Sequence, residues 1–156
     1  MDMDKNLPQN AYKRALIWLG GGHFINDIYT GVLNPIMPFI AAKIGISMAI
    51  ATIILTISHI FSSLLQPLFG FFADNNVKRS FIFWGLILSS LFIPMSAMAN
   101  KPLILVLFII IGSIGSSLFH PQALGFASRF AKYSDVGKAM AVFVAMGTLG
   151  YSCGPI

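Results

Sequence analysis

The chain has 156 residues, of which 56% are hydrophobic and 10% charged, and its mean hydropathy is +0.81. Because a soluble domain carries about 25% charged residues, this composition excludes a disordered chain, a disulfide scaffold and an ordinary soluble enzyme. A net charge of +5 would suggest nucleic acid in a soluble protein, but the basic residues lie mostly between apolar runs. We therefore expect an all-α membrane protein whose partner is the lipid bilayer and not nucleic acid.

Five apolar runs predict the transmembrane helices. A bilayer core about 30 Å thick is crossed by roughly 20 residues of helix, and each run is near or above that length. In chain order the runs predict helices over residues 15–42, 47–73, 81–99, 102–128 and 138–156. Residues 1–14 would then form an N-terminal segment outside the membrane.

The basic residues predict the orientation of these helices. Short loops rich in Lys and Arg stay in the cytoplasm. Eight of the ten basic residues lie before the first helix or after the second and fourth, and only Lys43 and Lys101 lie on the other side. We expect an integral membrane protein, of a plasma membrane or bacterial inner membrane, with residues 1–14 in the cytoplasm.

The first predicted helix carries a carboxylate near its middle. Asp27 in that position costs about 2.5–3.5 kcal/mol on insertion scales, so such a residue usually has a partner or a water-filled cavity. His23 lies four residues earlier and therefore on the same helical face. We predict that Asp27 and His23 exchange protons.

Polar residues also recur at helical spacing in the second and fourth helices, whereas the third is largely apolar and is expected to face lipid. Small polar residues in such rows often serve only helix packing. We nevertheless expect His59, Gln66 and His120 to line a cavity, and each histidine has packing as its open alternative.

The loop between the second and third helices holds the most informative motif. Its pattern resembles the cytoplasmic loop of the major facilitator superfamily, G-x-x-x-D-[RK]-x-G-[RK]-[RK], although Asn75 and Val77 depart from it. The resemblance implies a partial helix bundle of that superfamily with about five transmembrane helices, and a gating role for this loop. The matching residues are Gly70, Asp74, Lys78 and Arg79.

Three further segments are similar to fosmidomycin-resistance-type efflux proteins of that superfamily. They are residues 23–27, 62–67 and 115–121, in the same order as in that group. The resemblance implies that Asn26 and Gln122 also line the cavity, and Gln122 stands where the group usually has Glu. The fifth helix ends in a Gly-Pro segment similar to an antiporter packing motif, with Gly150, Gly154 and Pro155.

A complete transporter of this superfamily has two six-helix halves, so five helices form an incomplete half. The resemblance implies the N-terminal part of a proton-coupled exporter of small amphipathic or anionic compounds, working by alternating access. Its partners would be protons, a small-molecule substrate and the missing C-terminal helices or an assembling subunit. Two alternatives stay open: a truncated, non-transporting interaction or assembly subunit, and proton-driven uptake of a small anion or sugar.

An enzyme is not expected, because the sequence holds no nucleophile with a base and no glycine loop for phosphate. We likewise expect no metal and no cofactor.

Overall fold

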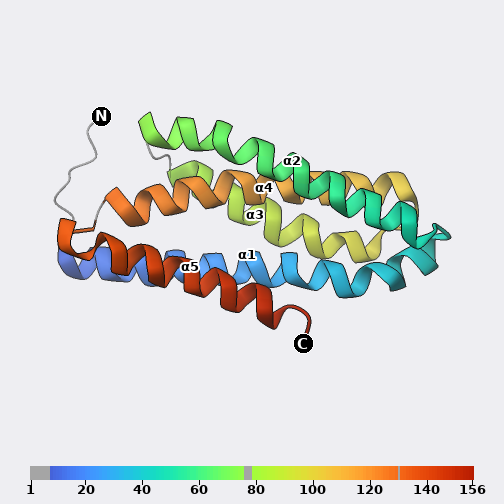
Figure 1. The fold of residues 1–156 in the computed structure, drawn as a ribbon, viewed down its shortest axis with the longest axis horizontal. Coiled ribbons are helices and arrows are strands. Elements are labelled where there is room, and N and C mark those ends of the chain that lie inside the picture. Colours follow the sequence, from blue (N-terminus) through green and yellow to red (C-terminus); the bar gives the residue numbers. More distant parts are fainter. Residues whose placement is uncertain (1–7, 76–78, 130) are drawn as a thin grey trace.

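The structure is a computed structural model that describes residues 8–75, 79–129 and 131–156. Its five α-helices confirm the predicted all-α fold (Figure 1). The helices are α1 Gln9–Ile44, α2 Met48–Asn75, α3 Arg79–Met95, α4 Pro102–Arg129 and α5 Val136–Cys153. Two short 3-10 turns follow α3 and precede α5, at Ser96–Met98 and Tyr133–Asp135.

Within the described residues, four segments are long and apolar enough to cross a membrane: Met48–Phe72, Arg79–Met98, Pro102–Arg129 and Val136–Cys153. The long helix α1 is not among them, because polar residues such as His23, Asn26 and Asp27 interrupt its apolar run. That α1 also crosses the membrane stays a prediction.

The ends of the helices follow from the local chemistry of the chain, and the start of the first helix differs from the predicted one. α1 begins at Gln9, so residues 9–14 extend the first helix. It ends before Gly45, which adopts a φ of 73° that suits glycine, and the Gly45 N–H donates to the carbonyl of Ala41. α4 begins at Pro102, a favourable first position because its missing N–H is not needed there.

The helices form a bundle in which α5 packs along α1, and both α2 and α3 pack along α4 (Figure 1). α3 buries Gly85, Ser89 and Ile93, while Trp84 and Leu91 face outward. α2 is the least buried of the four candidate spans. Its polar row is exposed in the bundle, namely Thr52, Thr56, His59, Ser63 and Gln66.

Two apolar clusters hold the bundle together. The larger one joins α1 and α4 with the start of α2 and includes the buried residues Met37, Leu105 and Ile109. The smaller one brings Phe119 of α4 against Phe143 of α5. Since both of these rings also contact the ring of His23, the smaller cluster fixes the position of that histidine on α1.

Candidate functional site

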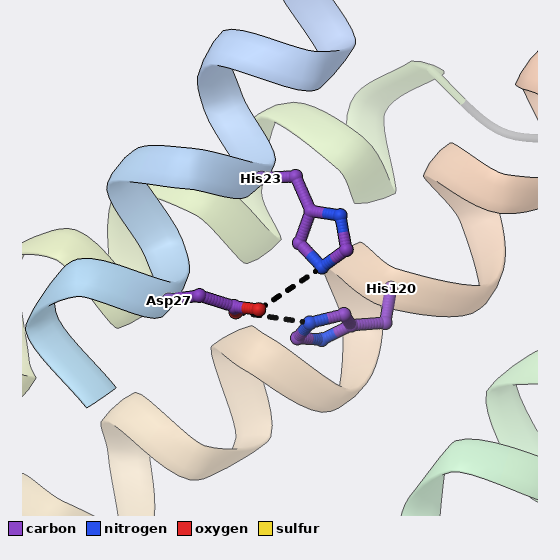
Figure 2. Close-up of side chains that lie close together, drawn as sticks. All are labelled: His23, Asp27 and His120. Carbon is purple, nitrogen blue, oxygen red and sulfur yellow. Dashed lines mark hydrogen bonds and ion pairs between the residues drawn. The ribbon is translucent and has the colours of Figure 1, made fainter. Parts of the chain in front are cut away.

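The central feature of the structure is a carboxylate placed between two imidazoles (Figure 2). His23 Nε2 lies 3.1 Å from Asp27 Oδ2, and His120 Nε2 lies 3.2 Å from Asp27 Oδ1. The side chains of His23, Asp27 and His120 are 8%, 18% and 25% exposed. The cluster therefore joins α1 to α4 inside the bundle and remains within reach of its surface.

Backbone carbonyls orient both histidines. His23 Nδ1 lies 2.8 Å from the carbonyl oxygen of Phe143, and His120 Nδ1 lies 2.8 Å from that of Ser116. Because a carbonyl oxygen only accepts, each Nδ1 carries the hydrogen and donates it. In both rings Nε2 is therefore the nitrogen that faces Asp27.

Neighbouring amide and hydroxyl groups support the carboxylate. Asn26, which is fully buried, donates through Nδ2 to Asp27 Oδ1 at 2.7 Å and to the hydroxyl of Ser116 at 3.2 Å. Ser116 also lies one helical turn before His120 and contacts its Nδ1. Ser116 is absent from the predicted site, although its spacing of four residues from His120 is a sequence signal for it.

Two cavities meet at His23. One of about 440 Å³ is lined by His23 and His120 together with Ser63 and Gln66 of α2. The other, of about 360 Å³, is lined by His23 and Asp27 with polar residues of α5. The cluster thus forms part of the wall of both cavities.

Gly147 of α5 makes room for the cluster. A Cβ at this position would lie 2.7 Å from Asp27 Oδ2 and would also overlap the ring of His23. The sequence shows Gly147 in a row with Gly150 and Gly154, but only the fold reveals that it faces the carboxylate. The lack of a side chain here lets α5 approach without displacing the histidine.

Comparison with known proteins identifies the family. The family model of the Major Facilitator Superfamily matches residues 19–156. The chain belongs to the Major Facilitator Superfamily. It is therefore an integral membrane protein of a transporter family and not an enzyme, as the sequence predicts.

Individual relatives agree with this assignment. The chain is 30% identical over 142 residues to the fosmidomycin resistance protein of Escherichia coli (strain K12), covering 86% of this chain and 33% of the relative. It is 25% identical over 149 residues to the "Uncharacterized MFS-type transporter YfnC" of Bacillus subtilis (strain 168), covering 96% of this chain and 36% of the relative.

A third relative is the "Probable nitrate transporter NarT" of Staphylococcus epidermidis (strain ATCC 35984 / DSM 28319 / BCRC 17069 / CCUG 31568 / BM 3577 / RP62A). The two chains are 28% identical over 129 residues, which cover 80% of this chain and 33% of the relative. The chain thus spans about a third of the length of these curated relatives. No solved structure gives a significant match.

The other cavity residues predicted for this superfamily member lie in different surroundings. Gln66 lines the larger cavity, as described above. His59 is exposed on α2, outside the cluster. Gln122 is fully buried and donates through Nε2 to the carbonyl of Phe69 at 3.3 Å, so it connects α4 to α2.

The superfamily loop motif is described only in part. Gly70 is half-buried near Pro121 of α4. The guanidinium of Arg79 lies 5.8 Å from the ring centre of Phe126 on the same α4. The side chain of Asp74 and all of Lys78 lie outside the described residues.

The predicted packing motif lies where α5 meets α1. A Cβ at Gly154 would lie 2.6 Å from the carbonyl oxygen of Ile28, and one at Gly150 would overlap the backbone of Phe24. Pro155 is exposed just beyond the last residue of α5. The two glycines therefore permit a backbone approach that any larger residue would prevent.

Proposed function

We propose that this chain forms part of a proton-coupled exporter of small amphipathic or anionic compounds that works by alternating access. The observation that carries the proposal is the placement of Asp27 between His23 and His120 on the wall of two cavities. Titratable groups inside a membrane bundle are costly and commonly mark proton pathways.

The hydrogen-bond pattern supports proton exchange at this cluster. Each Nδ1 donates to a carbonyl, so an Nε2 of His23 or His120 can donate to Asp27 only when the ring carries a second proton. Loss of that proton leaves a lone pair facing the carboxylate. Protonation would therefore change the contacts between α1 and α4 as well as the charge at the cavity wall.

The names of the relatives support the substrate class. A fosmidomycin resistance protein is consistent with export, because export lowers the internal concentration of an inhibitor. The similarity to NarT, a probable nitrate transporter, supports a small anion as the substrate and keeps uptake of a small anion as the second candidate. In both candidates the cavity lined by His23, His120 and Gln66 would hold the substrate.

The distribution of positive charge supports a cytoplasmic N terminus. In that orientation the loop with Gly70, Asp74, Lys78 and Arg79 lies on the cytoplasmic side. The Arg79 guanidinium already contacts α4 through Phe126, so a change in the packing of α4 would reach the loop. We propose that this loop gates the cytoplasmic opening.

The proposal is tested with the full-length transporter that contains this chain, reconstituted in vesicles holding a pH-sensitive dye. Fosmidomycin or nitrate is added and proton movement is recorded under an imposed pH gradient. We expect Asp27→Asn to abolish substrate-dependent proton movement while membrane insertion is retained.

Asp135→Asn is the matched control, because Asp135 lies in the turn before α5 and pairs only loosely with exposed Lys138 at 3.6 Å. The Asp135→Asn transporter should keep the wild-type rate of substrate-dependent proton movement. Unchanged proton movement in Asp27→Asn would overturn proton coupling at this residue, and substrate movement without protons in the wild type would overturn coupling altogether.

A further inference from the structure

The geometry points to a binding site for a divalent transition-metal cation, with Zn²⁺ as its representative, formed by His23, Asp27 and His120. One nitrogen from each imidazole and one carboxylate oxygen lie within 4.8 Å of one another. The sequence predicts no metal, because it shows no cluster of metal ligands. The fold assembles one by bringing His120 to Asp27, which lies 93 residues earlier in the chain. The site does not depend on the transport function proposed above.

The separations suit a metal ion. Zinc bonds to imidazole nitrogen at about 2.0–2.1 Å and to carboxylate oxygen at about 2.0–2.2 Å, which puts tetrahedral ligand atoms about 3.4 Å apart. The two nitrogen-to-oxygen distances in the cluster are 3.1 and 3.2 Å. These two distances end on different oxygens of the carboxylate, and one of these oxygens and the two nitrogens lie within 4.8 Å of one another. Binding of one ion through one oxygen therefore requires the longest of these separations to shorten toward about 3.4 Å. His120 is the most exposed of the three side chains.

The histidines already have the tautomer that a metal requires. Metal-bound histidines commonly donate the other ring N–H to a carbonyl, which fixes the ring and leaves the remaining lone pair for the ion. His23 does so toward Phe143, and His120 toward Ser116. Both Nε2 lone pairs then converge on a carboxylate, an arrangement that a shared cation stabilises.

The electrostatic balance and the donor set favour a divalent ion of the zinc type. Two neutral imidazoles and one carboxylate carry a charge of −1, so a bound divalent ion leaves +1, the same charge that two added protons would leave. Imidazole suits Zn²⁺, Co²⁺ and Ni²⁺, whereas Mg²⁺ and Ca²⁺ prefer oxygen ligands.

The site has an open side through which the ion can enter. His23 and His120 line the cavity of about 440 Å³, and His23 and Asp27 line the neighbouring cavity of about 360 Å³. Three protein ligands with a free position are typical of zinc sites that keep a water or bind a further ligand. A metal at this point would occupy the wall that faces the proposed substrate.

The test uses the full 156-residue chain, purified without a polyhistidine tag, in a Cys153→Ala background that removes the only thiol. Co²⁺ is titrated while its visible absorption is recorded, and Zn²⁺ binding is measured by calorimetry. We expect one equivalent of each metal to bind and Zn²⁺ to displace Co²⁺. Asp27→Asn and His120→Gln should each weaken binding at least 100-fold.

His59→Gln is the matched control for metal binding, because His59 is the remaining histidine and lies exposed outside the cluster. The His59→Gln chain should bind Co²⁺ and Zn²⁺ with the same affinity as the Cys153→Ala chain. His120→Gln is preferred to a change at His23, whose ring is stacked on Phe143 and supports the fold. Circular dichroism checks that each variant is folded.

Wild-type binding that survives both Asp27→Asn and His120→Gln, or no Co²⁺ spectrum at millimolar metal, would overturn the metal site. Neither result concerns proton movement in vesicles, which tests the proposed function separately. A chain that binds metal but moves no protons would retain this inference and remove the other.

Discussion

The substitution Gly150→Ala tests whether close packing of α5 on α1 holds the bundle together. Gly150 is buried in that contact, and a Cβ there would lie 2.9 Å from both the Cα and the carbonyl carbon of Phe24. Ordinary carbon–carbon contacts are about 3.5–4.0 Å, so the new methyl is at least about 0.6 Å too close. It meets backbone, which cannot rotate away as a side chain could.

The expected cost follows from two opposing effects. Overpacking costs about 1–3 kcal/mol, and a backbone clash belongs at the upper end of that range. Replacing glycine by alanine inside a helix returns about 0.8–1.0 kcal/mol of helix propensity. We therefore expect Gly150→Ala to lower the free energy of unfolding by about 2 kcal/mol, which is about a 30-fold change in the equilibrium constant.

The assay is unfolding by SDS in mixed micelles, followed by energy transfer from the tryptophans to an acceptor on Cys153, the only cysteine of the chain. Gly137→Ala is the control on the same helix, because a Cβ at Gly137 would meet nothing within 4 Å. It should leave stability unchanged or slightly raised. A Gly150→Ala protein as stable as this control would refute the packing argument.

Two further predictions concern the cluster and the contact between α4 and α2. Gly147→Ala should lower the pH-gradient-driven substrate flux of the full-length transporter roughly tenfold or more, because misplacement of reacting groups is costly. The new Cβ would displace the paired side chains of His23 and Asp27. A flux equal to that of Gly137→Ala in the same vesicles would contradict this prediction. Gln122→Glu should lower the free energy of unfolding in SDS by about 1–3 kcal/mol, since an ionised Glu cannot donate to the carbonyl of Phe69. A variant as stable as the wild type would show that this hydrogen bond contributes little.

The fold was largely predictable because each membrane helix must satisfy its own backbone, so an apolar run of sufficient length has few alternatives. The start of α1 was not predictable, because residues 9–14 are mostly polar and hydropathy does not mark their helix. The ends of α3 and α5 likewise depend on a 3-10 turn and on a Gly-Pro pair. Such local features act within one or two turns and leave only a weak pattern in the sequence.

The site was predictable within a helix but not between helices. His23 and Asp27 are four residues apart, so helical geometry alone brings them together, and their contact is indeed present. The contact of Asp27 with His120 depends on how α4 is rotated and placed against α1. No spacing in the sequence encodes that rotation, which depends on contacts between helices, such as the close approach of Gly115 to α3.

The structure makes α5 essential to a cluster to which it contributes no charged group. The carbonyl of Phe143 fixes the tautomer of His23, and the absence of a side chain at Gly147 leaves the space that His23 and Asp27 occupy. Both effects need α5 to lie very close to α1, which Gly150 and Gly154 permit. Helix packing and the proposed proton or metal chemistry are therefore linked through one interface. A shift of α5 away from α1 would release the hydrogen bond that keeps Nε2 of His23 facing the carboxylate.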